Sequence, residues 1–93
     1  MMQETITTLP GAEVLLRAKT FFAERVPQYS AFLEKEGPSY AVFRGQGGEE
    51  IAVAVFEAGN GVKVRASSML HEQIIGRFLS TLPQAEADQN EHS

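Results

Sequence analysis

Cysteine is absent from the 93 residues, so no disulfide can stabilise the fold. No clustered set of other side chains offers ligands for a structural metal, since one of the two histidines, His92, lies in the C-terminal tail. We therefore expect neither a metal nor another cofactor. A chain without cysteine fits the reducing cytosol, and the expected location is cytoplasmic.

A long apolar run is also missing. No stretch approaches the roughly twenty apolar residues that are needed to cross a bilayer. Residues 1–9 are polar and contain Glu4, so they have neither the basic start nor the apolar run of a secretion signal. The sequence therefore predicts no membrane insertion.

The chain has little clustered positive charge. The formal net charge is -4, but three of the twelve acidic residues lie beyond Leu82, which leaves nine acidic and eight basic residues and a charge near -1. Lys63 and Arg65 are two residues apart on one expected strand, and Arg44 can lie near them. Three cations fit a solvated strand face better than the positive footprint that phosphate binding needs. We expect no nucleic acid among the partners.

What is present fits one compact domain. Hydrophobic residues make up 43% of the chain and charged residues 22%, which is typical of globular proteins. We expect a single domain in residues 1–82 and a disordered acidic tail in residues 83–93. The first element is a short strand at residues 3–9, which are rich in threonine and are followed by Pro10 and Gly11.

Two stretches have apolar residues at spacings of three and four, which predicts two amphipathic helices. The first covers residues 12–26 and is closed by a proline. The second covers residues 69–82, and the hydroxyl of Ser67 or Ser68 is expected to cap it. The apolar stripes comprise Val14, Leu15, Ala18, Phe21, Phe22 and Val26 in the first helix, and Leu70, Ile74, Ile75, Phe78, Leu79 and Leu82 in the second.

Residues 28–36 allow two interpretations. A helix has support from apolar residues at helical spacing and from the glycine-proline pair that follows them. A strand puts Tyr29, Ala31 and Leu33 on one face and uses residues 34–39 as a hairpin turn. The strand is favoured, because the preceding proline already interrupts the helix.

Three further strands are predicted at residues 39–45, 50–57 and 62–68, which gives the order β-α-β-β-β-β-α. We expect an α+β domain with one antiparallel sheet of four to five strands and both helices packed on one face. Asn60-Gly61 is the strongest hairpin signal, because both residues accept the positive φ of a type I′ turn. This loop pairs Glu57 with Val64, Val55 with Ala66 and Phe56 with Arg65, and it gives the core face to Val53, Val55, Val64 and Ala66.

The glycine-rich stretch at residues 45–48 lacks the setting of a phosphate loop. Such a loop lies between a strand and a helix, whereas a strand follows here. Glu49 and Glu50 would repel phosphate, and neighbours on a strand point to opposite faces and cannot form an acid-base pair. We expect a hairpin turn with two solubilising carboxylates.

Side chains suited to catalysis are few. His71 lies in the first turn of the second helix and fits an exposed helix residue better than a base or a metal ligand. Ser67 and Ser68 have a capping role, which leaves little reason to assign either as a nucleophile. The sequence therefore predicts no catalytic residue and no enzyme activity.

The strand at residues 51–56 is apolar on both faces, although a sheet with water on one side normally alternates apolar and polar residues. The face opposite Val53 and Val55 therefore needs a cover. The preceding strand adds to it either Tyr40 and Val42 or Ala41 and Phe43, depending on the register of the glycine-rich turn. The candidate interface comprises Tyr40, Val42, Ala52, Ala54, Phe56 and Arg65.

Three explanations for this face compete. The stems of Lys63 and Arg65 can lie over it, and Arg65 over the Phe56 ring contributes about 0.5–1 kcal/mol. A protein partner can cover it, for instance by sheet packing in a homodimer. An apolar ligand can occupy a pocket between sheet and helix.

The order of elements over residues 3–82 resembles that of helix-grip folds and of the related TATA-binding-protein-like fold, in which a curved antiparallel sheet grips a C-terminal helix. The resemblance to larger helix-grip proteins implies a hydrophobic ligand between sheet and helix. The second resemblance implies DNA contact, which the near-neutral charge of the domain argues against. No functional residue is carried over, because the resemblance rests on element order.

We therefore expect a non-catalytic protein-interaction or accessory module that self-associates through its sheet. The alternative is a small hydrophobic-ligand-binding protein of the helix-grip kind.

Overall fold

The chain order of the elements is strand, helix, four strands and helix, as the sequence predicts. The computed structural model describes residues 2–25, 31–45, 47–69 and 72–85. The elements are β1 (Met2–Thr7), α1 (Gly11–Thr20) with the π-helical segment η1 (Phe21–Arg25), β2 (Phe32–Gly37), β3 (Tyr40–Arg44), β4 (Glu50–Ala58), β5 (Gly61–Ser68) and α2 (Glu72–Ser80).

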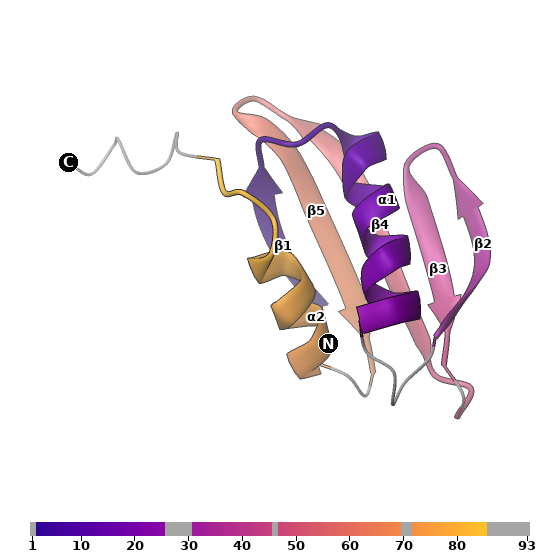
Figure 1. Ribbon diagram of the computed structural model, residues 1–93. Helices are drawn as coiled ribbons and strands as arrows, with labels where there is room; N and C mark the ends of the chain where they lie inside the picture. The colour runs from indigo at the N-terminus through magenta and orange to yellow at the C-terminus, as the bar shows by residue number, and fades with distance from the viewer. Residues whose placement is uncertain (1, 26–30, 46, 70–71, 86–93) are drawn as a thin grey trace.

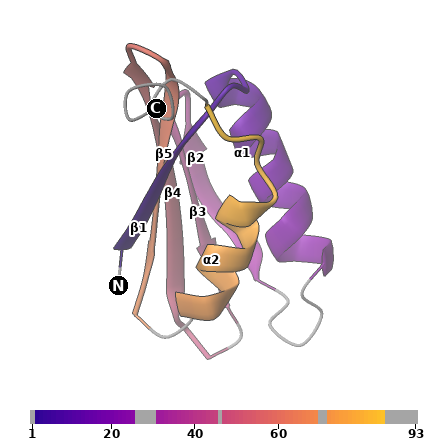
Figure 2. The same cartoon turned by 90° about the vertical axis from the view of Figure 1, so that its left-hand side faces the viewer.

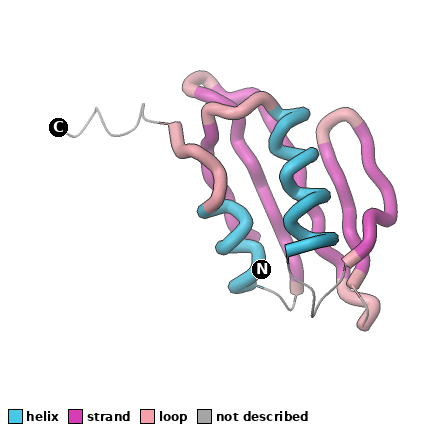
Figure 3. Tube along the Cα trace, viewed as in Figure 1, coloured by secondary structure: helices cyan, strands magenta, loops and turns pink. Residues whose placement is uncertain are grey.

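The five strands form one antiparallel sheet in the order β1-β5-β4-β3-β2. Both helices lie on the same face, with α1 against β4 and β3 and α2 against β5 and β1 (Figure 1). Figure 2 shows the sheet nearly edge-on, with α1 and α2 together on one side of it. The predicted α+β class and element order are confirmed, and the molecule has two layers (Figure 3).

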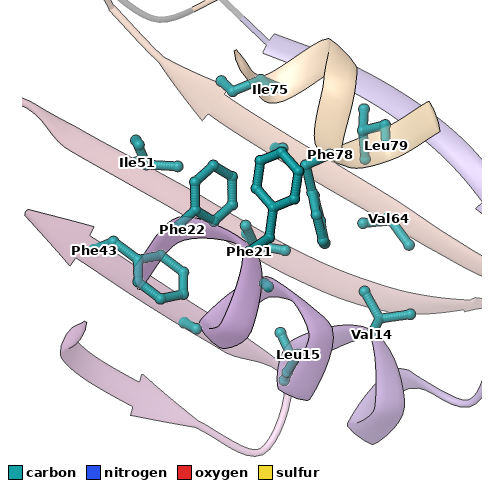
Figure 4. Packing of buried hydrophobic residues seen from close by; sticks show 14 of the residues in the cluster. Val14, Leu15, Phe21, Phe22, Phe43, Ile51, Val64, Ile75, Phe78 and Leu79 are labelled. Carbon is teal, nitrogen blue, oxygen red and sulfur yellow. The ribbon is translucent and has the colours of Figure 1, made fainter. Parts of the chain in front are cut away.

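Four phenylalanine rings join the two layers. Phe21 and Phe22 come from η1, Phe43 from β3 and Phe78 from α2, and all four are buried (Figure 4). The centroid of the Phe22 ring lies 5.1 Å from that of Phe21 and 5.3 Å from those of Phe43 and Phe78. These separations lie in the range of favourable aromatic pairs. The cluster fixes both helices on the sheet.

The first helix changes its geometry where these rings leave it. The sequence predicts one α-helix over residues 12–26, but the α-helical hydrogen bonds end at Thr20 and five residues continue as a π-helical turn. Such wide turns occur inside α-helices mostly as single turns. Here the turn carries the adjacent side chains of Phe21 and Phe22, both of which face the core. The predicted end at residues 26–27 lies outside the described residues.

The segment with two interpretations is a strand over its described part. β2 pairs with β3, and only Pro38 and Ser39 connect them, so the predicted turn at residues 34–39 was too long. The register shifts between Leu33 and Lys35, which indicates a β-bulge at the residue between them. Ala31 and Leu33 keep their expected place on the helix side, whereas Tyr29 lies outside the described residues.

The hairpin between β4 and β5 differs from its prediction by two residues. Its loop is Gly59 and Asn60, so Phe56 lies opposite Lys63 and Ala54 opposite Arg65. Gly61 belongs to β5 and pairs with Ala58. Its φ of 153° is one that other residues rarely adopt, and a Cβ there would lie 2.5 Å from the Thr7 carbonyl oxygen.

A shift of two residues leaves every side chain on its predicted face, since side chains alternate with a period of two. Val53, Val64 and Ala66 are fully buried, and Val55 packs partly buried against the same cluster. The predicted core face of this hairpin is therefore confirmed.

The start of the second helix also differs from its prediction. Ser67 and Ser68 both belong to β5, and Met69 follows outside any helix, so neither serine precedes α2 directly. Within the described residues α2 begins at Glu72 and buries Ile74, Ile75, Phe78 and Leu79. Leu70 and His71 lie outside the described residues.

Residues beyond α2 return to the sheet. The amide of Thr8 donates to the Pro83 carbonyl at 3.3 Å, and the amide of Ala85 donates to the Ile6 carbonyl at 2.9 Å. Gln84 forms a bridge with Thr7, whose hydroxyl donates to the Pro83 carbonyl at 2.5 Å. The outer edge of β1 is therefore paired over its last residues.

Removing one ring from the phenylalanine cluster should destabilise the fold strongly. Phe22→Ala is expected to lower the free energy of unfolding by about 3–5 kcal/mol, because it leaves a cavity among three other rings. Urea denaturation followed by circular dichroism measures the loss. Leu16→Ala is the control on the exposed side of α1 and should stay within about 0.5 kcal/mol of the parent. Similar losses in both variants would contradict the assignment of Phe22 to the core.

Gly59 and Gly61 in the hairpin between β4 and β5 should respond differently to replacement by alanine. Gly61→Ala is expected to lower the free energy of unfolding by more than about 1 kcal/mol, because the native φ disfavours a side chain and the Thr7 carbonyl blocks the Cβ. Gly59→Ala has free space around its Cβ and is expected to be neutral or slightly stabilising. Urea midpoints of both variants test this. Equal midpoints for the two variants would contradict the conformation of Gly61 and its contact with the Thr7 carbonyl.

Candidate functional site

The register of the strands decides which residues share the face of the sheet away from the helices. Tyr40 lies opposite Ala54 and Val42 opposite Ala52, whereas Ala41 and Phe43 are buried on the helix side. This choice between two pairs was open from the sequence alone. We call this side the open face. It carries Met2, Glu4, Ile6, Phe32, Lys35, Tyr40, Val42, Arg44, Glu50, Ala52, Ala54, Phe56, Lys63, Arg65 and Ser67.

Three aromatic side chains of the open face are accessible to solvent. The exposed fraction is 57% for Phe32, 39% for Tyr40 and 43% for Phe56. Val42 lies among them but is only 8% exposed, so it supports the surface more than it offers contact area. Aromatic side chains are enriched at protein interfaces relative to the rest of the surface.

Phe32 is a member of the open face that the sequence reasoning missed. Its partner in the ladder is Arg44, while its neighbour Leu33 lies opposite Phe43 on the helix side. The same alternation that placed Leu33 toward the core could have placed Phe32 outward. Because residues 28–36 fitted both a helix and a strand, the outward position of Phe32 was not predicted.

The centre of the open face carries small side chains. β4 is the central strand of the five, and Ala52 and Ala54 stand at its centre, half-buried. Larger side chains stand beside them, with Phe56 further along β4, Tyr40 on β3 and Arg65 on β5. The two alanines therefore have larger neighbours on their own strand and on both adjacent strands.

Arg65 links the centre of the open face to its β1 side. Its guanidinium lies 5.0 Å from the centroid of the Phe56 ring, a cation–π contact made diagonally because the two residues are not direct partners. The Nε of Arg65 donates to the Glu4 carboxylate at 2.7 Å. The expected draping of Arg65 over Phe56 is therefore present, yet the ring keeps nearly half of its surface exposed.

Arg44 connects three segments at the other side of the open face. One nitrogen lies 2.7 Å from the Glu34 carboxylate and 3.8 Å from that of Glu50, and another donates to the Gly48 carbonyl at 2.9 Å. The hydrogen bond with Glu34 raises the pKa of Arg44 above its ordinary value, and the Glu34 and Glu50 charges add to this. Arg44 thus stays charged and holds the bulge of β2 to the turn before β4.

Tyr40 covers a glycine on the edge strand. Its ring lies so close to Gly37 that any side chain at that position would collide with it. An aromatic ring over a glycine of the neighbouring strand shields the exposed backbone there. The Tyr40 ring thus packs over Gly37 while part of its surface remains exposed on the open face.

Neither edge of the sheet favours pairing with another strand. The last residues of β1 already pair with the segment after α2. β2 carries a bulge and the exposed charged residues Glu34, Lys35 and Glu36. Bulges and charges on edge strands prevent pairing between molecules. Both edges of the sheet therefore disfavour pairing with a further strand.

The other sequence candidates give no reactive arrangement in the described part of the chain. The turn at residues 45–48 joins β3 to β4, with Gly45 donating to the Glu49 carbonyl at 2.8 Å, so a strand does follow it. His71 lies outside the described residues. Over residues 2–25, 31–45, 47–69 and 72–85, no group of three or more His, Asp or Glu side chains could hold a metal ion. No described helix is long and apolar enough to cross a membrane.

Hollows on the described surface include two that lie away from the centre of the open face. One of about 610 Å³ lies where the turn before β4 meets the end of β5, lined by Arg44, Gly48, Ser67 and Met69 among others. Another of about 440 Å³ lies between α1 and the end of α2, beside Leu16 and Phe21. Both are open to solvent.

Comparisons with known proteins give no relative for this chain. No protein-family model matches it, and neither the curated proteins nor the solved structures contain a significant match. Its function is therefore argued from its own geometry.

Arg44 should control the order of the turn before β4. Arg44→Met keeps the stem but removes the contacts with Glu34, Glu50 and Gly48, so the amides of Gly45 and Gly48 should exchange with solvent faster. Hydrogen exchange measured by NMR at these two amides tests this. Lys35→Met is the control, because Lys35 stands on the same face and has no ion pair among the described residues. Unchanged exchange in Arg44→Met would contradict the role of Arg44.

Proposed function

We propose that this chain is a non-catalytic interaction module that self-associates through the open face of its sheet. The observation that carries the proposal is the set of exposed aromatic side chains, Phe32, Tyr40 and Phe56, on the same face as Ala52 and Ala54. Both helices pack on the other face, so no described helix covers these residues. An exposed apolar surface of this kind is typical of protein contact sites.

The size of the face suits a small dimer. β4 has nine residues and is about 30 Å long at roughly 3.3 Å per residue, and five strands about 4.8 Å apart make a sheet about 24 Å wide. Since the outer strands are shorter, the face measures roughly 500–700 Å². Each partner in a typical specific complex buries about 800 Å². The open face alone supplies most of that area.

The charges of the open face support a protein partner over a nucleic acid. Four cations stand on it, Lys35, Arg44, Lys63 and Arg65, beside the carboxylates of Glu4, Glu34 and Glu50. Two of the four cations are already in ion pairs with these carboxylates. Phosphate binding needs unneutralised cations in a cluster. A nearly balanced face suits a second protein surface.

Binding of a hydrophobic ligand between sheet and helices has no comparable support. The four phenylalanine rings occupy that space, with centroid separations of 5.1–5.5 Å, and the side chains around them are buried. The two hollows described above lie at the surface. A ligand would have to displace the cluster that holds the two layers together.

Phe56→Glu should separate the self-associated protein into monomers without unfolding it. A carboxylate at this exposed position would be desolvated at the centre of the contact, whereas in the monomer Lys63 and Arg65 stand beside it. Analytical ultracentrifugation over a range of concentrations measures the mass, and circular dichroism checks the fold. We expect a concentration-dependent dimer for the parent and a monomer for the variant.

Leu16→Glu is the matched control, since Leu16 is an exposed apolar residue on the helix side. It should dimerise like the parent. A parent that stays monomeric at all concentrations would refute self-association, and a dimer that survives Phe56→Glu but is lost in Leu16→Glu would move the contact to the helices.

A further inference from the structure

We infer that, in the dimer, β4 of one copy lies over β4 of the other, with the two-fold axis running parallel to this strand. The inference rests on the proposed self-association through the open face and specifies its geometry. β4 is the middle strand of the sheet, so an axis above it lets all five strands contribute on both sides. The second copy thus covers Ala52 and Ala54 on β4.

The residues of β4 allow the closest approach at this line. Ala52 and Ala54 project only a methyl group from the sheet, so two copies can approach closely there. Their neighbours in the ladder are larger and flank the contact. Packed sheets normally lie about 10 Å apart. A contact centred on β3 would bring Tyr40 against itself, and one centred on β5 would bring Arg65 against itself. A contact centred on β4 brings the small Ala52 and Ala54 against their own copies, with the Phe56 pair towards one end of the strand and the Glu50 pair, each beside its own Arg44, at the other.

The two flanks of β4 differ in chemistry, which selects the direction of the axis. The flank formed by β5 and β1 carries charged groups, including Arg65 with its bound Glu4. The flank formed by β3 and β2 carries the rings of Tyr40 and Phe32. An axis parallel to β4 places each flank on the opposite flank of the partner, so Arg65 lies near the partner's Tyr40. An axis across β4 places like charges of the two Arg65 side chains on the same flank.

Arg65 can enter such a contact without an unpaired charge. Glu4 stays bound to it, and its guanidinium already packs on one ring of its own chain, Phe56. Arginine stacks on aromatic faces and is more weakly hydrated than lysine, so it is favoured in interfaces. The free side of the guanidinium can therefore meet the ring of the partner's Tyr40.

Cross-linking from single cysteines tests the geometry, because the parent chain has no cysteine. Ser67, Ala52 and Val42 form one row across the sheet and can be replaced by cysteine with little change in size. A short bismaleimide that spans about the 10 Å between packed sheets is the probe. Ala52→Cys should give cross-linked dimers by itself. Ser67→Cys mixed with Val42→Cys should cross-link, while Ser67→Cys alone should not, because its two copies lie about 14 Å apart.

The mass of each variant is measured by ultracentrifugation before cross-linking. This measurement distinguishes failure of self-association from failure of the β4-over-β4 geometry. A dimer in which Ala52→Cys does not cross-link, or in which Ser67→Cys alone cross-links as well as the mixture, would overturn this geometry and leave self-association standing. A monomer would overturn both. Leu16→Cys, on the helix side, sets the background from random collisions. Cross-linking of Ala52→Cys no greater than that background would count as its failure.

Discussion

The packing of both helices onto one face of the sheet, through the rings of Phe21, Phe22, Phe43 and Phe78, is the contact on which the rest of the molecule depends. It joins the N-terminal and C-terminal helices to β3 in one cluster. Among the described residues both helices lie on one side of the sheet, which leaves the other side without a described helix over it. The open face is thus a direct consequence of how the core is built.

The periodicity of the sequence predicted the layers of the fold and the membership of the central face, even where details were wrong. The predicted loop between β4 and β5 was wrong, yet Val53, Val64 and Ala66 are on the core face. A register error of two residues leaves each side chain on the same face of the sheet. The same alternation identified Ala52, Ala54 and Phe56 as outward residues. In the observed register Gly61 pairs with Ala58 and lies beside the Thr7 carbonyl of β1, a tertiary contact that no local pattern records.

Other features lay beyond sequence reasoning for similar reasons. The bulge of β2 appears only in the pairing of this strand with β3, and the ion pair between Glu34 and Arg44 lies beside it. The return of Pro83, Gln84 and Ala85 to β1 is made through main-chain groups, which are the same in every residue. Phe32 was missed because its segment fitted two periodicities.

Because the domain is small, covering the open face would affect its free energy of unfolding. A single small core without a disulfide supplies little stability, because the entropy lost on folding nearly cancels the gain from burial. A partner that binds only the folded state stabilises it by mass action. Covering Phe32, Tyr40 and Phe56 would therefore strengthen the fold and remove the apolar surface at once. The paired edge of β1 and the charged, bulged edge of β2 leave the face as the favourable place for that contact.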